Sequence, residues 1–195
     1  MSDNNRQFKI QDTVPVRTIG IETERENLDF QHRPPHRYAH VWFAPRPTPV
    51  SRLAVLASVL PDSIDDDTLL NWMGFKPSNR NPDDSIAEHV RNKRQTKDQR
   101  SGSEHEHYGY RKIWRYTPSD TEKDEIHNSL ENTWDGELPT VLDATAGGGS
   151  IPLESIRYGL PTIANELNPV PSVVLKALLE YTRTDVDLTD DIIKW

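Results

Sequence analysis

The sequence contains no cysteine among its 195 residues. This absence excludes a disulfide scaffold, a thiol nucleophile and any cysteine-ligated zinc or iron–sulfur site. Long apolar runs are also missing: the longest uninterrupted one covers residues 53–57, far short of the roughly 20 residues that span a bilayer. The first five residues are polar and lack the apolar stretch of a secretory signal. We therefore expect a cytoplasmic protein.

Lysine is scarce, with 8 Lys against 15 Arg, whereas aspartate is abundant and the net charge is −8. A dense carboxylate surface stays hydrated when salt screens its charges, so this balance is typical of proteins from a high-salt cytoplasm. We expect a halophilic protein; an ordinary acidic cytoplasmic protein is the alternative. Only 34% of the residues are hydrophobic and 15 are proline, which predicts long irregular stretches.

The pattern along the chain suggests three segments: an N-terminal accessory module (1–62), a variable and partly irregular insertion or linker (63–136), and an α/β segment (137–195). In the first, residues 48–60 predict a helix with Thr48 as its cap, Pro49 at its first position and an apolar face. That face consists of Val50, Leu53, Ala54, Ala57 and Leu60. In the second, residues 76–106 predict loop or weakly structured chain, and residues 119–134 an acidic surface helix.

Residues 89–115 form a basic stretch, with 8 Lys or Arg against 3 Asp or Glu. Tyr108, Tyr110 and Trp114 are interleaved with these charges, as in segments that bind nucleic acid by phosphate contacts and base stacking. A solvated linker is the alternative that we favour. His105 and His107 alternate around Glu106 without a further ligand, so we expect no metal site.

The last 59 residues have the clearest pattern. A short strand at 140–143 leads into a glycine turn at 146–150 and a helix at 151–157, and a second strand follows at 162–164. Asn168 and Pro169 then predict the start of another helix, with an apolar face of Val170, Val173, Val174, Ala177, Leu178 and Tyr181. This alternation predicts a parallel α/β sheet with crossover helices.

The glycine turn indicates a nucleoside ligand. Glycines between a strand and a helix let backbone N–H groups approach a ligand closely. Glu166 ends the second strand, 23 residues after Asp143, close to the offset at which an acidic residue binds ribose hydroxyls. The turn is not Gly-x-Gly-x-x-Gly, and the Asp143 carboxylate would repel a pyrophosphate. Both features favour S-adenosylmethionine over NAD, and a purely structural glycine turn remains the alternative.

Three stretches carry a family resemblance. Residues 142–154, Leu-Asp-Ala-Thr-Ala-Gly-Gly-Gly-Ser-Ile-Pro-Leu-Glu, resemble motif I of the S-adenosylmethionine-dependent methyltransferases. They are most similar to the Asp-Pro-Phe-Ala-Gly-Gly-Gly form of the adenine-specific DNA methylases. Residues 166–170, Glu-Leu-Asn-Pro-Val, look like the acidic second motif. Residues 40–47, His-Val-Trp-Phe-Ala-Pro-Arg-Pro, followed by Arg52, look like the His-x-Trp-Trp-Ala-Arg-Arg-Pro segment of those methylases that begin with domain of unknown function 1156.

The resemblance implies a fold, a function and a set of site residues. The fold would be a mostly helical or irregular N-terminal region followed by the opening strands and helices of a Rossmann-like methyltransferase sheet. The function would be N6-adenine methylation of DNA, in restriction–modification or phage defence, with S-adenosyl-L-methionine as cofactor. The implied cofactor-binding residues are Asp143, Ala146, Gly147, Gly149, Glu166 and Asn168, with Glu166 on the ribose and Asn168 near the adenine. The implied nucleic-acid contacts are His40, Trp42, Arg46 and Arg52. The equal alternative for the first three is a turn anchored by Trp42 on the helix predicted at 48–60, with Arg46 solvated.

One motif of these methylases is absent from the sequence. Their Asp/Asn-Pro-Pro-Tyr/Phe loop grips the target amine, but the one Pro-Pro here, Pro34-Pro35, lies between Arg33 and His36. We therefore assign no catalytic residue and do not expect the chain alone to methylate DNA. The chain would be a truncated or split gene product, or its catalytic half a separate chain. A non-catalytic binding or interaction fragment and an RNA methylase remain alternatives.

Overall fold

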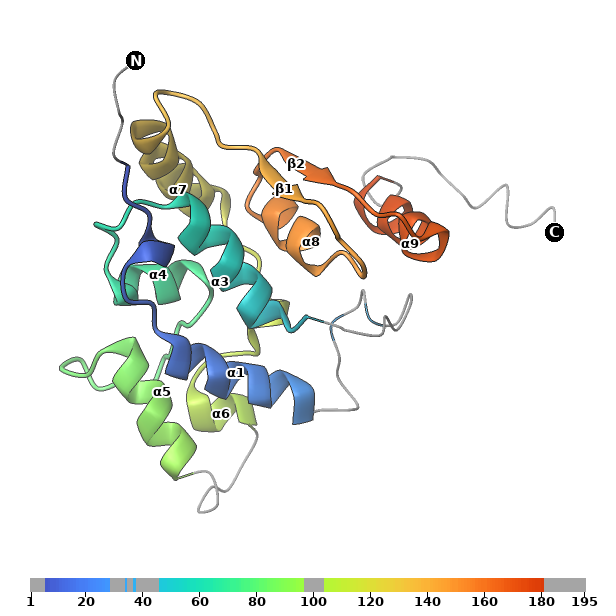
Figure 1. Cartoon of the computed structure of the whole chain (residues 1–195). Coiled ribbons are helices and arrows are strands. Elements are labelled where there is room, and N and C mark those ends of the chain that lie inside the picture. Colours follow the sequence, from blue (N-terminus) through green and yellow to red (C-terminus); the bar gives the residue numbers. More distant parts are fainter. Residues whose placement is uncertain (1–5, 29–33, 35–36, 38–45, 97–103, 181–195) are drawn as a thin grey trace.

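The computed structural model describes residues 6–28, 34, 37, 46–96 and 104–180 (Figure 1). In these ranges the chain is mostly helical, with eight α-helices and one small parallel sheet of two strands. The α-helices and strands, in chain order, are α1 (Val16–Leu28), α3 (Thr48–Val59), α4 (Asp66–Trp72), α5 (Ile86–Gln95), α6 (Glu104–Tyr108), α7 (Asp120–Thr133), β1 (Val141–Asp143), α8 (Ser150–Arg157), β2 (Thr162–Ala164) and α9 (Pro169–Leu179); two short 3₁₀ helices cover Lys9–Gln11 and Ile113–Arg115.

Helix α3 lies at the centre of the described structure, between α1 and the β1–α8–β2 unit (Figure 1). This confirms the helix predicted at 48–60. The predicted apolar face is partly wrong, because Val50 is exposed and the most buried side chains include Val55 and Leu56. A helix that packs on several sides buries more than one stripe of its surface. All three predicted segments contribute to the surrounding core, for example through Ile19, Leu70 and Tyr158.

The start of α3 is capped from another helix. The structure places Pro47 at the N-cap and Thr48 inside the first turn, so the predicted capping role of Thr48 is wrong. Instead, both carboxylate oxygens of Glu26 on α1 accept a hydrogen bond from the Thr48 N–H, each at 3.1 Å. The Arg37 guanidinium contacts the same carboxylate at 2.8 Å. Tertiary contacts therefore satisfy a helix end that local sequence leaves open.

The prediction of loop or weakly structured chain for residues 76–106 is confirmed at 76–85, where the chain forms only turns and bends, and is wrong for α5 and for the start of α6; residues 97–103 lie outside the described residues. Ser85 caps α5 by accepting a hydrogen bond from the Glu88 N–H at 3.1 Å. Only Ile86, His89 and Val90 of this helix are buried, an apolar face too short to stand out among polar residues. Packing against α1 and α4 supplies the remaining stabilisation.

The sequence prediction for α7 is confirmed. Ser119 and Glu122 form a reciprocal capping box, in which the Ser119 hydroxyl accepts from the Glu122 N–H and the Glu122 carboxylate accepts from the Ser119 N–H. Ile126 and Leu130 are the buried residues of this otherwise polar helix, as expected for a surface helix.

The two predicted strands and their crossover helix are also confirmed. Strands β1 and β2 are parallel, with Leu142 opposite Ile163, and α8 connects them and packs against both. Leu142 and Ile163 are 64% and 56% exposed, so the sheet face that they occupy is not covered by the described residues. The described sheet is a parallel pair of strands in a mostly helical structure, which does not by itself show the expected Rossmann-like sheet.

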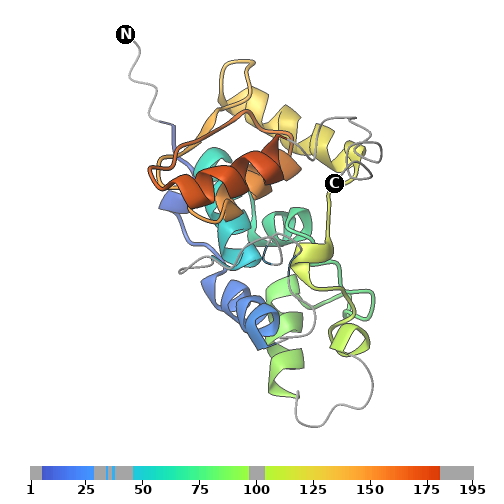
Figure 2. The ribbon, with the colours of Figure 1, turned by 90° about the vertical axis from the view of Figure 1, so that its right-hand side faces the viewer.

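Helix α9 begins as predicted but presents a different face to the interior. Asn168 caps it by accepting from the Val170 N–H at 3.0 Å. Val170 and Val173, predicted to be buried, are exposed, whereas Pro171 and Leu175 are buried. Figure 2 shows α9 on the outer side of the β1–α8–β2 unit. No helix in the described ranges is both long and apolar enough to cross a membrane.

Candidate functional site

The glycine turn between β1 and α8 is held in shape by its own backbone and by β2. Gly147 and Gly149 have positive φ angles of 51° and 78°, a conformation that glycine adopts without a steric penalty. The turn closes by a hydrogen bond from the Gly149 N–H to the Ala146 carbonyl at 2.9 Å. The Ala146 N–H donates to the carbonyl of Asn165, after β2, at 3.0 Å. The turn is therefore fixed against the carboxyl end of the neighbouring strand.

Asp143 is a buried carboxylate at the end of β1, with only 7% of its surface exposed. Its Oδ1 accepts a hydrogen bond from the Thr145 N–H at 3.2 Å. Its Oδ2 is buried and receives no hydrogen bond from the described residues. Nη1 of Arg46 lies 3.6 Å from it, which is beyond normal hydrogen-bond length. Because a buried carboxylate oxygen without a hydrogen bond is costly, Oδ2 is ready to accept one from a ligand.

Glu166 connects the glycine turn to the start of α9. Its Oε2 accepts a hydrogen bond from the Gly147 N–H at 2.8 Å, and its Oε1 accepts one from the Asn168 N–H at 3.0 Å. These backbone donors, Asn168 first and Gly147 second, lower the pKa of Glu166 below its usual value. The carboxylate is therefore ionised at neutral pH, and each oxygen keeps a second lone pair for another donor.

The structure thus brings together the six residues that the sequence assigned to a cofactor. The backbone of Asn165 links Asp143 to the turn, donating to the Asp143 carbonyl and accepting from the Ala146 N–H, and the Glu166 carboxylate joins the turn through the Gly147 N–H. Sequence reasoning missed Asn165, whose side chain also donates to the Ala144 carbonyl at 3.1 Å. Oδ1 of Asn168 caps α9, which leaves the amide nitrogen of that side chain and the second lone pair of Oδ1 for a contact with adenine.

The four residues assigned to nucleic-acid contacts lie in different environments, and two of them fall outside the described residues. His40 and Trp42 lie outside the described residues. Arg46 is half exposed and lies beside Asp143. Arg52 is fully buried: its Nε donates to Glu154 Oε2 at 2.7 Å and its Nη1 to the Met73 carbonyl at 2.7 Å. A guanidinium enclosed in this way is not accessible to nucleic acid. The predicted nucleic-acid contact of Arg52 is therefore wrong.

Two of the three aromatic residues named in the basic segment are also buried, and the third, Trp114, is half-buried. Tyr108 and Tyr110 are 0% and 3% exposed, and the Arg25 guanidinium lies over the Tyr108 ring at 4.0 Å. Base stacking on these two rings is therefore excluded in this structure, and the favoured description as a solvated linker is wrong for the part that forms α5 and α6. No cluster of three or more metal-ligating side chains occurs in the described ranges.

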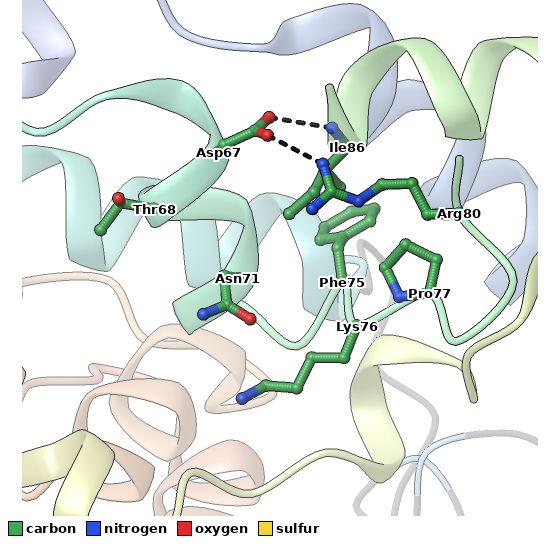
Figure 3. A pocket seen from close by; sticks show the side chains of 8 residues that line it. All are labelled: Asp67, Thr68, Asn71, Phe75, Lys76, Pro77, Arg80 and Ile86. Atoms are coloured by element: carbon green, nitrogen blue, oxygen red, sulfur yellow. Dashed lines mark hydrogen bonds and ion pairs between the residues drawn. The ribbon is translucent and has the colours of Figure 1, made fainter. Parts of the chain in front are cut away.

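A cavity of about 470 Å³ lies away from the glycine turn, among residues of α4 and the chain that leads into α5 (Figure 3). Asp67 accepts hydrogen bonds there from the Ile86 N–H at 2.9 Å and from Arg80 Nη1 at 3.4 Å. Lys76 is paired with Glu122. These charged groups are already satisfied by one another, so we assign no ligand to this cavity.

Comparison with known families gives one match. Residues 13–101 match the family described as "Protein of unknown function (DUF1156)". This confirms the resemblance of the N-terminal segment to domain of unknown function 1156, and extends it across α4 and α5. No curated protein and no solved structure matches the chain.

Proposed function

We propose that this chain contributes the cofactor-binding part of an S-adenosylmethionine-dependent methyltransferase that acts on the N6 amino group of adenine in DNA. The observation that carries the proposal is the buried Oδ2 of Asp143, which lacks a hydrogen-bond donor at the end of a strand that leads into a glycine turn. This oxygen suits the ammonium group of an amino acid. The methylase-like motifs at 142–154 and 166–170 support the choice of ligand and of reaction.

Each part of the proposed site has a separate task. Asp143 accepts a hydrogen bond from the ligand's ammonium group, and Glu166 accepts from ribose hydroxyls while its backbone contacts keep it ionised. The turn at Gly147 and Gly149 allows close approach of the backbone to the ligand. When bound, S-adenosylmethionine supplies an electrophilic methyl group on its sulfonium. Proximity and orientation would account for the acceleration of transfer.

The proposal includes two partners. DNA would supply the adenine, which must leave the base stack for its amino group to be reached. A polypeptide with the Asp/Asn-Pro-Pro-Tyr/Phe loop would hold that amine, because this sequence has no such loop. A Rossmann-like sheet would be completed by further strands beside β1 and β2, and the exposed side chains of Leu142 and Ile163 favour this.

The test is a titration of the purified chain with S-adenosylhomocysteine. Binding is monitored through amide chemical shifts in a ¹H–¹⁵N spectrum, a measurement that detects weak binding. We expect shifts at Gly147, Gly149 and Glu166. Asp143→Asn keeps the shape but removes the charge, and should weaken binding about 10- to 100-fold. Asp124→Asn, on the exposed surface of α7, is the matched control and should bind normally. Unchanged spectra at millimolar ligand, or normal binding by Asp143→Asn, would reject the proposal.

A second candidate function is a non-catalytic interaction module. It is favoured by the exposed apolar side chains around the sheet and α9, which are Leu142, Ile163, Leu167, Val170 and Val173. Such a concentration of exposed apolar surface is typical of an interface. The same titration separates the two candidates, because an interaction module has no need to bind S-adenosylhomocysteine.

A further inference from the structure

Arg46 and Asp143 form a pair of opposite charges that do not neutralise each other through a hydrogen bond. Nη1 of Arg46 is 3.6 Å from Oδ2 of Asp143, close enough for attraction but too long for a normal hydrogen bond. The Arg46 side chain is 48% exposed, whereas that of Asp143 is 7% exposed. The arginine therefore keeps most of its donors available beside a buried acceptor.

The backbone of Arg46 is fixed by the elements around it. Pro47, the next residue, is the N-cap of α3, and the carbonyl of Arg46 accepts a hydrogen bond from Arg37 Nη2 at 3.4 Å. Helix α3 is itself joined to α8 by the buried pair of Arg52 and Glu154. The α3–α8 contact thus holds Arg46 beside the β1 end of the glycine turn, although the two lie far apart in the sequence.

An amino-acid group is a ligand that fits such a pair. Its ammonium and carboxylate are attached to the same carbon, so a protein that binds both needs an acceptor and a cationic donor side by side. The planar guanidinium of arginine matches a carboxylate with two parallel hydrogen bonds. A phosphate fits less well, because the neighbouring Asp143 carboxylate would repel its charge.

We propose that Arg46 binds the α-carboxylate of the amino-acid part of the ligand while Asp143 binds its α-ammonium. This inference rests on the proposed function and deepens it. It assigns Arg46 to the cofactor instead of to nucleic acid. It also gives the region matched to DUF1156 a direct part in the cofactor site, through a residue contributed from outside the strand–glycine turn–helix unit.

The test uses a matched series of ligands with isothermal titration calorimetry on the full chain. S-adenosylhomocysteine carries both charged groups, its decarboxylated analogue S-adenosyl-3-thiopropylamine carries only the ammonium, and methylthioadenosine carries neither. Arg46→Gln should weaken binding of S-adenosylhomocysteine about 10- to 100-fold, leave binding of methylthioadenosine unchanged, and not weaken binding of S-adenosyl-3-thiopropylamine. Asp143→Asn should weaken binding of S-adenosylhomocysteine and of S-adenosyl-3-thiopropylamine, and it should leave binding of methylthioadenosine unchanged. Arg46→Lys keeps the positive charge but loses the planar guanidinium that donates two parallel hydrogen bonds. It should give an intermediate loss of affinity for S-adenosylhomocysteine.

The control and the contrary outcomes separate this inference from the proposed function. Arg111→Gln removes an exposed arginine elsewhere and should leave all three affinities unchanged. If the wild-type chain binds none of the ligands, both the proposed function and this inference fail. If it binds S-adenosylhomocysteine but Arg46→Gln weakens binding of all three ligands equally, or weakens binding of none, only the inference fails.

Discussion

Arg52 illustrates at the scale of one residue how a buried charge is made tolerable. Each of its guanidinium nitrogens has a described acceptor: Glu154 for Nε, the Met73 carbonyl for Nη1 and the Tyr116 carbonyl for Nη2. The Arg157 side chain gives Glu154 a second contact at 3.2 Å. Full pairing offsets the loss of hydration, so the contact fixes α3 against α8.

Removing one member of this pair should destabilise the chain strongly. Arg52→Met leaves Glu154 buried beside one remaining cation, and we expect a loss of about 3–5 kcal/mol in the free energy of unfolding, measured with urea. Lys123→Met is the control, because Lys123 pairs with the exposed Asp120, and its effect should stay below about 1 kcal/mol. Equal losses in the two variants would contradict a structural role for Arg52.

The lowered pKa of Glu166 predicts a pH-dependent contribution to stability. A carboxyl whose pKa is lower in the folded state than in the unfolded state stabilises the fold above its unfolded pKa, and the contribution disappears as the pH falls. Glu166→Gln lacks this titration. The difference in unfolding free energy between wild type and Glu166→Gln should therefore be largest near about pH 7 and shrink below about pH 4.5.

Measurement by urea unfolding across this range checks the prediction. Glu180→Gln, at the exposed C-cap of α9, serves as the comparison for loss of a surface carboxylate. A difference for Glu166→Gln that stays constant, or grows, as the pH falls would show that the backbone hydrogen bonds do not hold the carboxylate in its ionised form.

At the scale of elements, the glycine turn is packed under α9. A Cβ added at Gly149 would lie 2.8 Å from Leu175 Cδ2, and the residue has a φ of 78°. Gly149→Ala should therefore destabilise the chain by roughly 1–3 kcal/mol through backbone strain and the steric clash. The measurement is the thermal or urea unfolding midpoint.

The same substitution in α1 should have the opposite sign. Gly20 lies within α1, and a Cβ added there meets nothing within 4 Å. Alanine at this position should stabilise the chain by about 0.5–1 kcal/mol, because it restricts the unfolded chain and favours helix. If both alanine variants shift the unfolding midpoint in the same direction, the packing argument for Gly149 is wrong.

At the scale of the whole molecule, the net charge of −8 predicts stabilisation by salt. Screening reduces the repulsion among surface carboxylates, while buried pairs such as Arg52 and Glu154 are screened much less. We expect the thermal midpoint to rise between about 0.1 M and about 2 M KCl. Sucrose, which does not screen charge, is the control. A midpoint that falls in KCl would contradict the prediction of a halophilic protein.

The sequence by itself determined the features that depend on neighbouring residues. The capping box of Ser119 and Glu122, the Asn168 cap and the positive φ of Gly149 each act within a few residues of chain. For that reason the strands, the glycine turn, α7, α8 and the start of α9 could be predicted. Asp143 at the end of β1, the glycine turn after it and Glu166 after β2 were found from the same local pattern, and the resemblance to methyltransferase motifs added Asn168.

Only the tertiary structure decided which side chains are buried and which meet across the fold. Nothing local indicates that Glu26 caps α3, that Arg52 pairs with Glu154, or that Arg46 lies beside Asp143. It also decided that Val173 faces outward. The physical reason is that burial and charge pairing depend on which elements pack together, and residues distant in sequence acquire these contacts only when the chain has folded.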